Sequence, residues 1–407
     1  MALTTVFTVA GLIIFIGFIG EWIFGKTNIP DVIWLMLLGI LVGQFSPVAN
    51  DPAFLKIAPI FTTFALIFIL FEGAINIDIR KLLKGVAGGG SLSFLNFILS
   101  LIIVPIVMLI VGWSFWEGLL LGAMIGGASS AVIIPLTKKI NMKPNTALVL
   151  TFESAISDVL CIVGTLTILN IMILKSFSFG DVVQKIVYSF GIAIFIGIIG
   201  GLSWVKLEKS MEKISKSYMT TIAALMLLYS FTEFLESNGA IACLAFGIIV
   251  GNSKKIFSFL DHKREYKMSP SEKFFFSEIS FFVKTFFFFY LGMIINLSDI
   301  PLILLGLLLT IILFLVRPLA VSIASRKQKL SDKDRVFMEI LTPKGLAAAV
   351  LAQLPAQTGV AYGEQFSTIV LSVIFFSILI STIGVFVTER GKFKGLKRLL
   401  DLRKFRR

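Results

Sequence analysis

Two carboxylates and two serines interrupt a long apolar stretch of the sequence at residues 151–161, TFESAISDVLC. Ser154 precedes Asp158 by four positions, so the two side chains share one face of a helix. Glu153 and Ser157 form a second pair with the same spacing, turned by about 100° around the helix axis. Carboxylate and hydroxyl oxygens are hard ligands, which suit Na⁺, K⁺ or H⁺ better than they suit a soft metal. The segment therefore predicts an ion site centred on Asp158.

Ionisable side chains within long apolar segments point to function, because each costs roughly 2.5–3.5 kcal/mol on insertion scales if the segment crosses a membrane. In this sequence they are Glu72, Glu153, Asp158, Lys284, Arg317 and Lys344. For Asp158 the alternative to an ion site is a structural hydrogen-bonded patch between helices. Glu153 is equally well explained by a structural ion pair with a buried lysine, either Lys344 or Lys284. Glu72 closes its span and lies either at the cytoplasmic end or within reach of a cavity.

Composition identifies the elements that must position these residues. Hydrophobic residues make up 57% of the 407 residues and charged residues 15%, with a mean hydropathy of +0.95, whereas soluble proteins carry about 25% charged residues. Apolar segments of about 20 residues, enough to cross a bilayer, recur along the chain. The sequence therefore predicts an all-α polytopic membrane protein, with the N-terminal segment retained as its first helix.

We expect thirteen transmembrane spans. They cover roughly 3–24, 30–48, 57–77, 86–112, 116–137, 145–174, 182–205, 217–236, 239–252, 273–297, 299–323, 334–356 and 365–389.

The distribution of positive charge predicts the orientation of these spans. Most of the 37 Lys and Arg residues fall in the loops after the odd-numbered spans and in the tail at 391–407. We expect the protein to lie in the plasma membrane. The positive-inside rule then places the N-terminus outside the cell and the C-terminus in the cytoplasm. The net charge of +13 is explained by topology, so nucleic acid is not an expected partner. The basic tail has the composition of an anionic-lipid contact.

Two spans are interrupted by glycine and proline. The fifth carries GAMIGGASSAVIIPL, with Gly122, Gly126, Gly127 and Pro135, and the twelfth carries LTPKGLAAAVLAQLP around Lys344. If the seventh span (182–205) is a linker within a single domain of 1–390, then 1–174 and 217–389 form two repeats of six spans, and each broken span is fifth in its repeat. Matched broken helices point to a transport site at an inverted-repeat interface. The alternative is that the small residues serve packing alone.

The sequence offers little support for an enzyme. It contains no metal-ligand cluster, nucleophile elbow or phosphate loop, its single histidine is His262 in a polar segment, and Cys161 and Cys243 both lie in apolar spans. We expect no cofactor and no disulfide framework. The alternative within transport proteins is a channel-like cation efflux protein controlled by a separate regulatory subunit.

An ordered set of motifs resembles the monovalent cation/proton antiporters of the NhaP type. The motifs are LFEGAINIDIRKL, GASSAVIIPL, FESAISDVL, SNGAIACLAFGIIVGN, FFVKTFFFFYLGMIINL, FLVRPLAV and TPKGLAAAVLA. The resemblance implies a homodimer, each protomer having a dimerisation bundle and a six-helix core in which two unwound helices cross beside the ion site.

The resemblance also implies roles for individual residues. Asp158 matches the essential ion-binding aspartate and Ser154 a serine ligand, while Glu153 matches an acid that pairs with a buried basic residue. The other matching positions are Lys344 and Lys284, which are basic in the family, and Glu72, an acid near the cytoplasmic funnel.

Two positions depart from the family pattern. Ser157 stands where the family usually has Asn or Asp, and Ser129 and Ser130 stand where it usually has Thr-Asp. The expected site therefore has one central carboxylate, with oxygens added by serines 129, 130, 154 and 157. One carboxylate favours electroneutral exchange of one Na⁺ for one H⁺, with K⁺ as the alternative cation.

Overall fold

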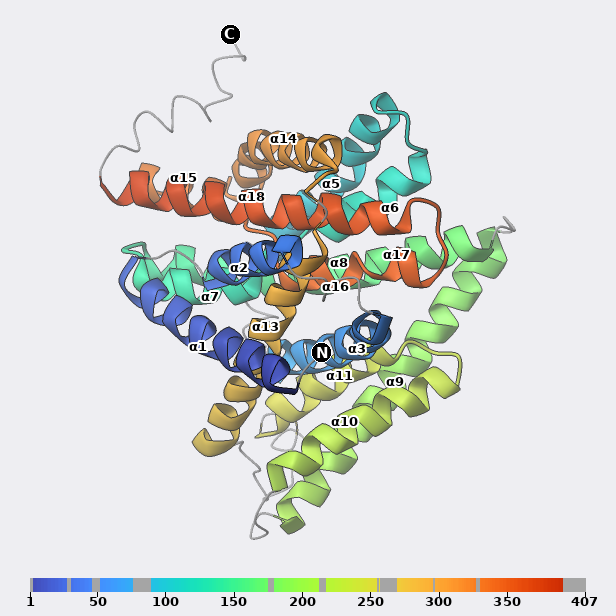
Figure 1. The fold of residues 1–407 in the computed structure, drawn as a ribbon. Helices are drawn as coiled ribbons and strands as arrows, with labels where there is room; N and C mark the ends of the chain where they lie inside the picture. The colour runs from blue at the N-terminus through green and yellow to red at the C-terminus, as the bar shows by residue number, and fades with distance from the viewer. Residues whose placement is uncertain are drawn as a thin grey trace. The chain divides into compact units, whose positions relative to one another are not determined.

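The computed structural model describes residues 3–27, 31–45, 52–75, 89–174, 179–211, 217–254, 256, 269–295, 297–326 and 330–390. These residues are almost entirely helical and contain no strand (Figure 1). The helices are α1 (Leu3–Thr27), α2 (Asp31–Phe45), α3 (Pro52–Ile75), α5 (Ser91–Ile110), α6 (Phe115–Ile125), α7 (Ser130–Lys139), α8 (Pro144–Leu174), α9 (Phe179–Met211), α10 (Ser217–Phe234), α11 (Gly239–Gly251), α13 (Pro270–Ile294), α14 (Ile300–Ala324), α15 (Asp332–Ile340), α16 (Leu346–Leu351), α17 (Leu354–Gln357) and α18 (Gly363–Glu389).

The all-α membrane architecture is confirmed. Each of the thirteen expected spans coincides with one helix, or with a run of shorter helices at the two interrupted spans. Within the described residues, six helices are long and apolar enough to cross a membrane by themselves. Those six fall in α5, α8, α9, α13, α14 and α18.

The chain divides into two compact units, of which the first comprises residues 1–55, 84–173 and 285–407. In this unit α5 packs against α6 and α14, and α14 packs against α18. The backbones of α2 and α13 also meet, at Gly39 and Gly292. A Cβ added to either glycine would collide with the backbone of the other helix. Small residues at such crossings let membrane helices approach closely. This unit holds every polar residue around Asp158 that is described below.

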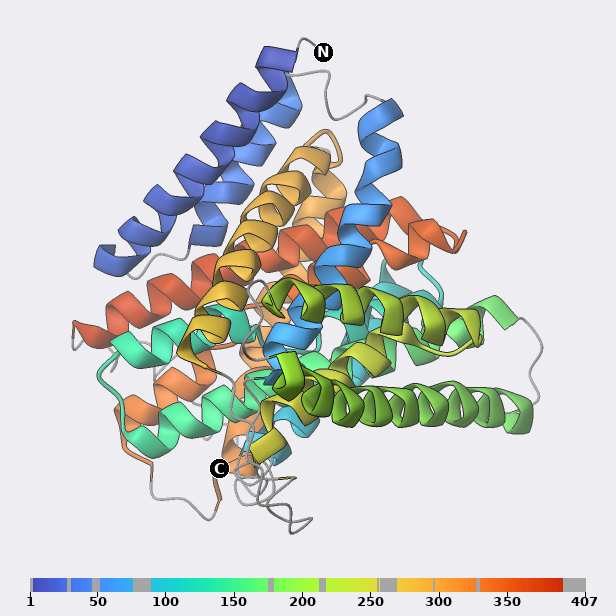
Figure 2. The same ribbon diagram turned by 90° about the horizontal axis from the view of Figure 1, so that it is seen from below.

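The second unit comprises residues 56–83 and 174–284. Helices α9, α10 and α11 pack against one another in it, and Figure 2 shows α9 and α10 lying side by side. Its core is strongly aromatic: the rings of Phe71 and Phe276 meet edge to face with centroids 5.2 Å apart, and Phe68 and Phe246 are buried beside them. Part of the phenylalanine-rich tenth span thus forms a packing surface.

Both predicted interruptions are present, with a correction to their extent. Residues 126–129 separate α6 from α7, and residues 341–345 separate α15 from α16. Proline disfavours helical geometry at the residue before it, which explains the end of α15 shortly before Pro343. The expectation that Gly122 and Pro135 belong to the break is wrong, because they lie inside α6 and α7.

Candidate functional site

The two interrupted helix runs touch each other at their breaks. The backbone N–H of Ser129 donates to the carbonyl oxygen of Pro343 across 2.7 Å. Gly345 lies against the side chain of Ser129 and leaves no room there for a Cβ. Backbone freed from a helix in a membrane must find partners in protein or in a water-filled cavity. At this crossing each break supplies a partner for the other.

Asp158 of α8 faces the start of α7. Its Oδ2 accepts a hydrogen bond of 2.7 Å from the hydroxyl of Ser130, the first residue of that helix. The N-terminal end of a helix presents free N–H groups and a partial positive charge, which favour a negative group. The Asp158 side chain is only partly buried, in contrast to Glu153 one turn earlier. It is therefore the carboxylate of this region that keeps access to its surroundings.

The neighbouring serines extend the oxygen set. The hydroxyl of Ser157 accepts the Ala128 N–H at 2.9 Å and donates to a carbonyl, either that of Ser154 at 3.0 Å or that of Ala128 at 3.2 Å. The hydroxyl of Ser154 donates to the Thr151 carbonyl at 3.0 Å, which leaves its oxygen able to accept or to coordinate. Ser129, Ser154 and Ser157 are all buried.

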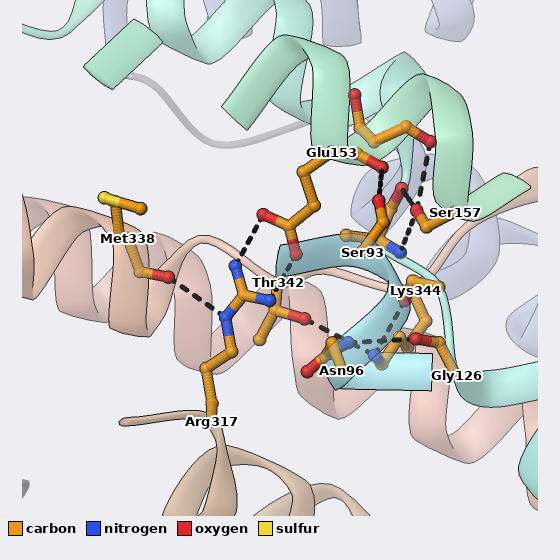
Figure 3. Close-up of polar contacts among 12 residues, drawn as sticks. Ser93, Asn96, Gly126, Glu153, Ser157, Arg317, Met338, Thr342 and Lys344 are labelled. Carbon is orange, nitrogen blue, oxygen red and sulfur yellow. Dashed lines mark hydrogen bonds and ion pairs between the residues drawn. The ribbon is translucent and has the colours of Figure 1, made fainter. Parts of the chain in front are cut away.

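Lys344 lies at the carbonyl end of α6. Its ammonium donates to the carbonyl oxygen of Gly127 at 2.7 Å and, more weakly, to the Thr342 hydroxyl at 3.4 Å (Figure 3). Its backbone N–H donates to the hydroxyl of Ser377 at 2.8 Å. A cation at the C-terminal end of a helix offsets the negative end of the helix dipole. Lys344 thus complements the end of the crossing that carries negative partial charge.

Glu153 forms its ion pair with Arg317, and the expectation of a lysine partner is wrong. Both side chains are completely buried, and the guanidinium engages both carboxylate oxygens, with 2.6 Å between Nη2 and Oε2. The third donor of the fork, Nε, bonds the Met338 carbonyl of α15 at 3.1 Å. A planar guanidinium matches a carboxylate with two parallel bonds, which an ammonium cannot do. The pair ties α8, α14 and α15 together.

Glu72 and Lys284 lie in the second compact unit, on α3 and α13, and both are partly buried. The Lys284 ammonium lies 6.0 Å from the centroid of the Phe281 ring. Their assignment as supporting residues stays a prediction.

Sequence reasoning missed several residues that hold the crossing together. Arg317 was recognised as an ionisable residue within a span but was given no role. The side chains of Ser93 and Asn96 on α5 bond backbone carbonyls of Glu153 at 2.6 Å and Gly126 at 2.9 Å. Serine and asparagine in an apolar span were the available signal, since such residues often hydrogen-bond a neighbouring helix.

The chemistry available to this arrangement is that of a hard oxygen site. One partly accessible carboxylate lies among hydroxyls and backbone carbonyls, which are ligands for an alkali cation or acceptors for a proton. In the described part of the chain no group of three or more His, Cys, Asp or Glu residues could hold a metal ion. A crossing of interrupted helices beside such a carboxylate is the arrangement found in secondary transporters.

Comparisons with known proteins agree with this geometry. Residues 11–389 match the family model described as sodium/hydrogen exchanger, transmembrane. The chain belongs to the sodium/hydrogen exchanger family. Members of this family are membrane antiporters, which exchange a monovalent cation for protons.

Two curated relatives of this exchanger cover most of the chain. Na(+)/H(+) antiporter 1 of Methanocaldococcus jannaschii is 28% identical over 365 residues, which is 84% of this chain and 81% of the relative. K(+)/H(+) antiporter NhaP2 of Shewanella sp. (strain ANA-3) is 25% identical over 87% of this chain, and the chain spans 61% of that relative's length.

A solved structure shares the fold of this exchanger. The structure of the sodium proton antiporter MjNhaP1 from Methanocaldococcus jannaschii at pH 8 superposes with a TM-score of 0.74 and 23% identity. The similarity covers 96% of this chain and 99% of the solved one. It supports the antiporter fold for the whole of the described helical assembly.

The buried ion pair of the exchanger should dominate its stability at this crossing. Replacing Arg317 with Met leaves the Glu153 carboxylate buried without its partner, and we expect destabilisation by about 3–5 kcal/mol. Arg335→Met removes a partly exposed pair with Glu339 (side chains 25% and 5% exposed) and should cost much less. Thermal unfolding of the purified proteins in detergent measures both. Equal melting temperatures for Arg317→Met and wild type would contradict the assignment, and the double variant Arg317→Met/Glu153→Gln should recover part of the loss.

Proposed function

We propose that the chain exchanges Na⁺ for H⁺ across the membrane, and that Asp158 binds the two ions in turn. The observation that carries this proposal is the position of Asp158 at the crossing: it is partly accessible and is bonded by Ser130 at the N-terminal end of the second half-helix. Glu153, the other carboxylate of α8, is held in a buried pair with Arg317. Asp158 is therefore the carboxylate of α8 that can release one ion and bind another.

The hydroxyls of Ser129, Ser130, Ser154 and Ser157 complete the proposed ion-binding set. Loss of hydration at the site is offset by these oxygens, by backbone carbonyls and by the carboxylate charge. A proton and a cation cannot occupy the same carboxylate oxygens together, because each neutralises the charge that attracts the other. Exchange follows from this competition.

Transport requires that the loaded site open to one side of the membrane at a time. We propose that the helices around the crossing move together in this step. The Glu153–Arg317 pair joins α8 and α14, the Arg317 bond to Met338 adds α15, and the Ser93 bond to the Glu153 carbonyl adds α5. Packed units joined in this way change position as bodies rather than deforming continuously.

The organisation of the protein in the membrane follows from the same proposal. The two broken spans would occupy equivalent positions in repeats 1–174 and 217–389, separated by a linker helix at 182–205. The distribution of positive charge supports a plasma-membrane protein with an external N-terminus and a cytoplasmic C-terminus, and the family resemblance supports a homodimer. Labelling of single cysteines placed in loops, from either side of the membrane, tests the orientation.

K⁺ is the second candidate for the transported cation. The Shewanella relative, which is 25% identical, is a K(+)/H(+) antiporter by name. This chain has hydroxyls at positions 130 and 157, where the family usually has Asp and Asn or Asp, so its site carries fewer negative charges than the usual family site. A site with fewer negative charges attracts small cations less strongly. The ranking of the two ions is therefore part of the test.

Substitution of the carboxylate tests the proposal directly. In proteoliposomes with an imposed pH gradient, wild-type protein should dissipate the gradient when Na⁺ or K⁺ is added, and Asp158→Asn should not. Asparagine keeps the shape of the side chain and can still accept from Ser130, so loss of exchange reports loss of the charge. Undiminished exchange by Asp158→Asn, or no response of well-folded wild type to either ion, would overturn the proposal.

A single central carboxylate predicts that exchange moves no net charge. A membrane-potential dye in the same liposomes, kept free of K⁺, should stay unchanged during Na⁺/H⁺ turnover. A potential that develops with turnover would show that a second proton or charge is carried. That result would exclude one-for-one stoichiometry while leaving antiport intact.

A further inference from the structure

One face of the largely apolar helix α5 carries three hydrogen-bond donors. Ser93, Asn96 and Ser100 follow one another at intervals of three and four residues, so their side chains lie along one face. Each donates to a backbone carbonyl of another helix: Ser93 to Glu153 at 2.6 Å, Asn96 to Gly126 at 2.9 Å and Ser100 to Gly122 at 2.8 Å. The same face thus binds both segments that form the ion site.

A seam of glycines brings α6 against this face. Gly118, Gly122 and Gly126 recur at every fourth position, and at each of them a Cβ would collide with α5. The three obstructing residues are Pro105, Ser100 and Phe97. This is the small-residue spacing that lets two membrane helices approach backbone to backbone. The close approach is what allows short side chains such as serine and asparagine to reach the carbonyls of α6.

The carbonyl oxygens that accept these hydrogen bonds differ in their place in the structure. The carbonyl of Gly122 belongs to a regular turn of α6, whereas Gly126 is the residue at which the helix stops. The last carbonyls of a helix have no partner within it and must be satisfied from outside, above all in a membrane. The Asn96 amide supplies that partner at the first residue of the break.

Four groups that follow Gly126 bond residues of the site. The Gly127 carbonyl receives the Lys344 ammonium, the Ala128 N–H bonds Ser157, the Ser129 N–H bonds Pro343, and Ser130 donates to Asp158. Figure 3 shows Asn96, Gly126 and Lys344 close together at this end of the crossing. The orientation of the peptide at Gly126 sets the direction in which these four residues leave α6.

We propose that Asn96 is a positioning residue of the ion site: by holding the Gly126 carbonyl it fixes the break, and thereby the placement of Ser129 and Ser130 around the cation at Asp158. The amide does not touch the ion. Its effect passes through the backbone of residues 126–130. The inference rests on the proposed role of Asp158 as the ion-binding carboxylate.

The experiment compares Asn96→Leu with Ser100→Ala, which removes the neighbouring donor from the same face but leaves the break untouched. We expect Asn96→Leu to raise the Na⁺ concentration for half-maximal exchange about five- to tenfold, because the hydrogen bond that holds the break is lost and the placement of Ser129 and Ser130 around the cation with it. The pH profile of exchange should move with it, because protons and Na⁺ compete at one site. Ser100→Ala should leave both readouts at the wild-type value, and Asn96→Gln, which keeps the donor, should restore much of the affinity.

Thermal unfolding of the detergent-solubilised protein measures binding without transport. A bound Na⁺ or K⁺ should raise the melting temperature. Wild type stabilised by a cation, with Asp158→Asn insensitive to it, establishes the site independently of this inference. In that case, unchanged half-saturation in Asn96→Leu, or an equal change in Ser100→Ala, would overturn the role of Asn96. If wild type itself neither exchanges nor responds to any cation, the proposed function fails instead.

Discussion

The structure depends on one requirement, that backbone groups released inside a membrane find hydrogen-bond partners. Two helical runs are interrupted in the described part of the chain, at residues 126–129 and 341–345, and each interruption leaves N–H and C=O groups that lipid cannot satisfy. The contact of Ser129 N–H with the Pro343 carbonyl satisfies one break from the other. Side chains from α5, from α8 and from the second break bond further groups of the first break, and Ser377 of α18 bonds the Lys344 N–H of the second. A polar crossing of this kind is stable only when all of these elements are in place, so the fold and the site are specified together.

The same requirement explains which parts of the fold were predictable. Hydropathy located thirteen apolar segments, each of which coincides with one helix or a run of shorter helices, since a segment that crosses the bilayer must be long and apolar. The breaks were also visible, because Gly126, Gly127 and Pro343 weaken a helix wherever they occur. Gly122 looked the same in sequence yet lies within α6, where it packs on α5. A glycine that breaks a helix and a glycine that packs one differ only in their neighbours, which the local sequence does not specify.

The partner of Glu153 shows where sequence reasoning stops. Arg317 lies 164 positions away in α14, and its own segment marks it as an ionisable residue within a span without indicating its partner. Lys344 was the more prominent basic residue because it lies at a break. Its ammonium instead bonds the carbonyl of Gly127. The two basic side chains therefore neutralise two different negative features: Arg317 pairs with a carboxylate, and Lys344 bonds the end of a helix. Only the tertiary arrangement shows which basic residue pairs with which feature.

The distribution of charge at the crossing bears on the proposed exchange of ions at Asp158. The end of α6 is matched by the fixed ammonium of Lys344, and the start of α7 is matched by the carboxylate of Asp158. With Asp158 ionised and empty, these two side chains have no net charge between them. With either a proton or a monovalent cation bound, they carry the same single positive charge. The two loaded states are thus electrostatically equivalent to the surrounding helices, while the empty state differs from both. Under the proposed mechanism the protein meets the same electrostatic cost with either ion, so one arrangement that allows movement of the loaded site would serve both directions of exchange.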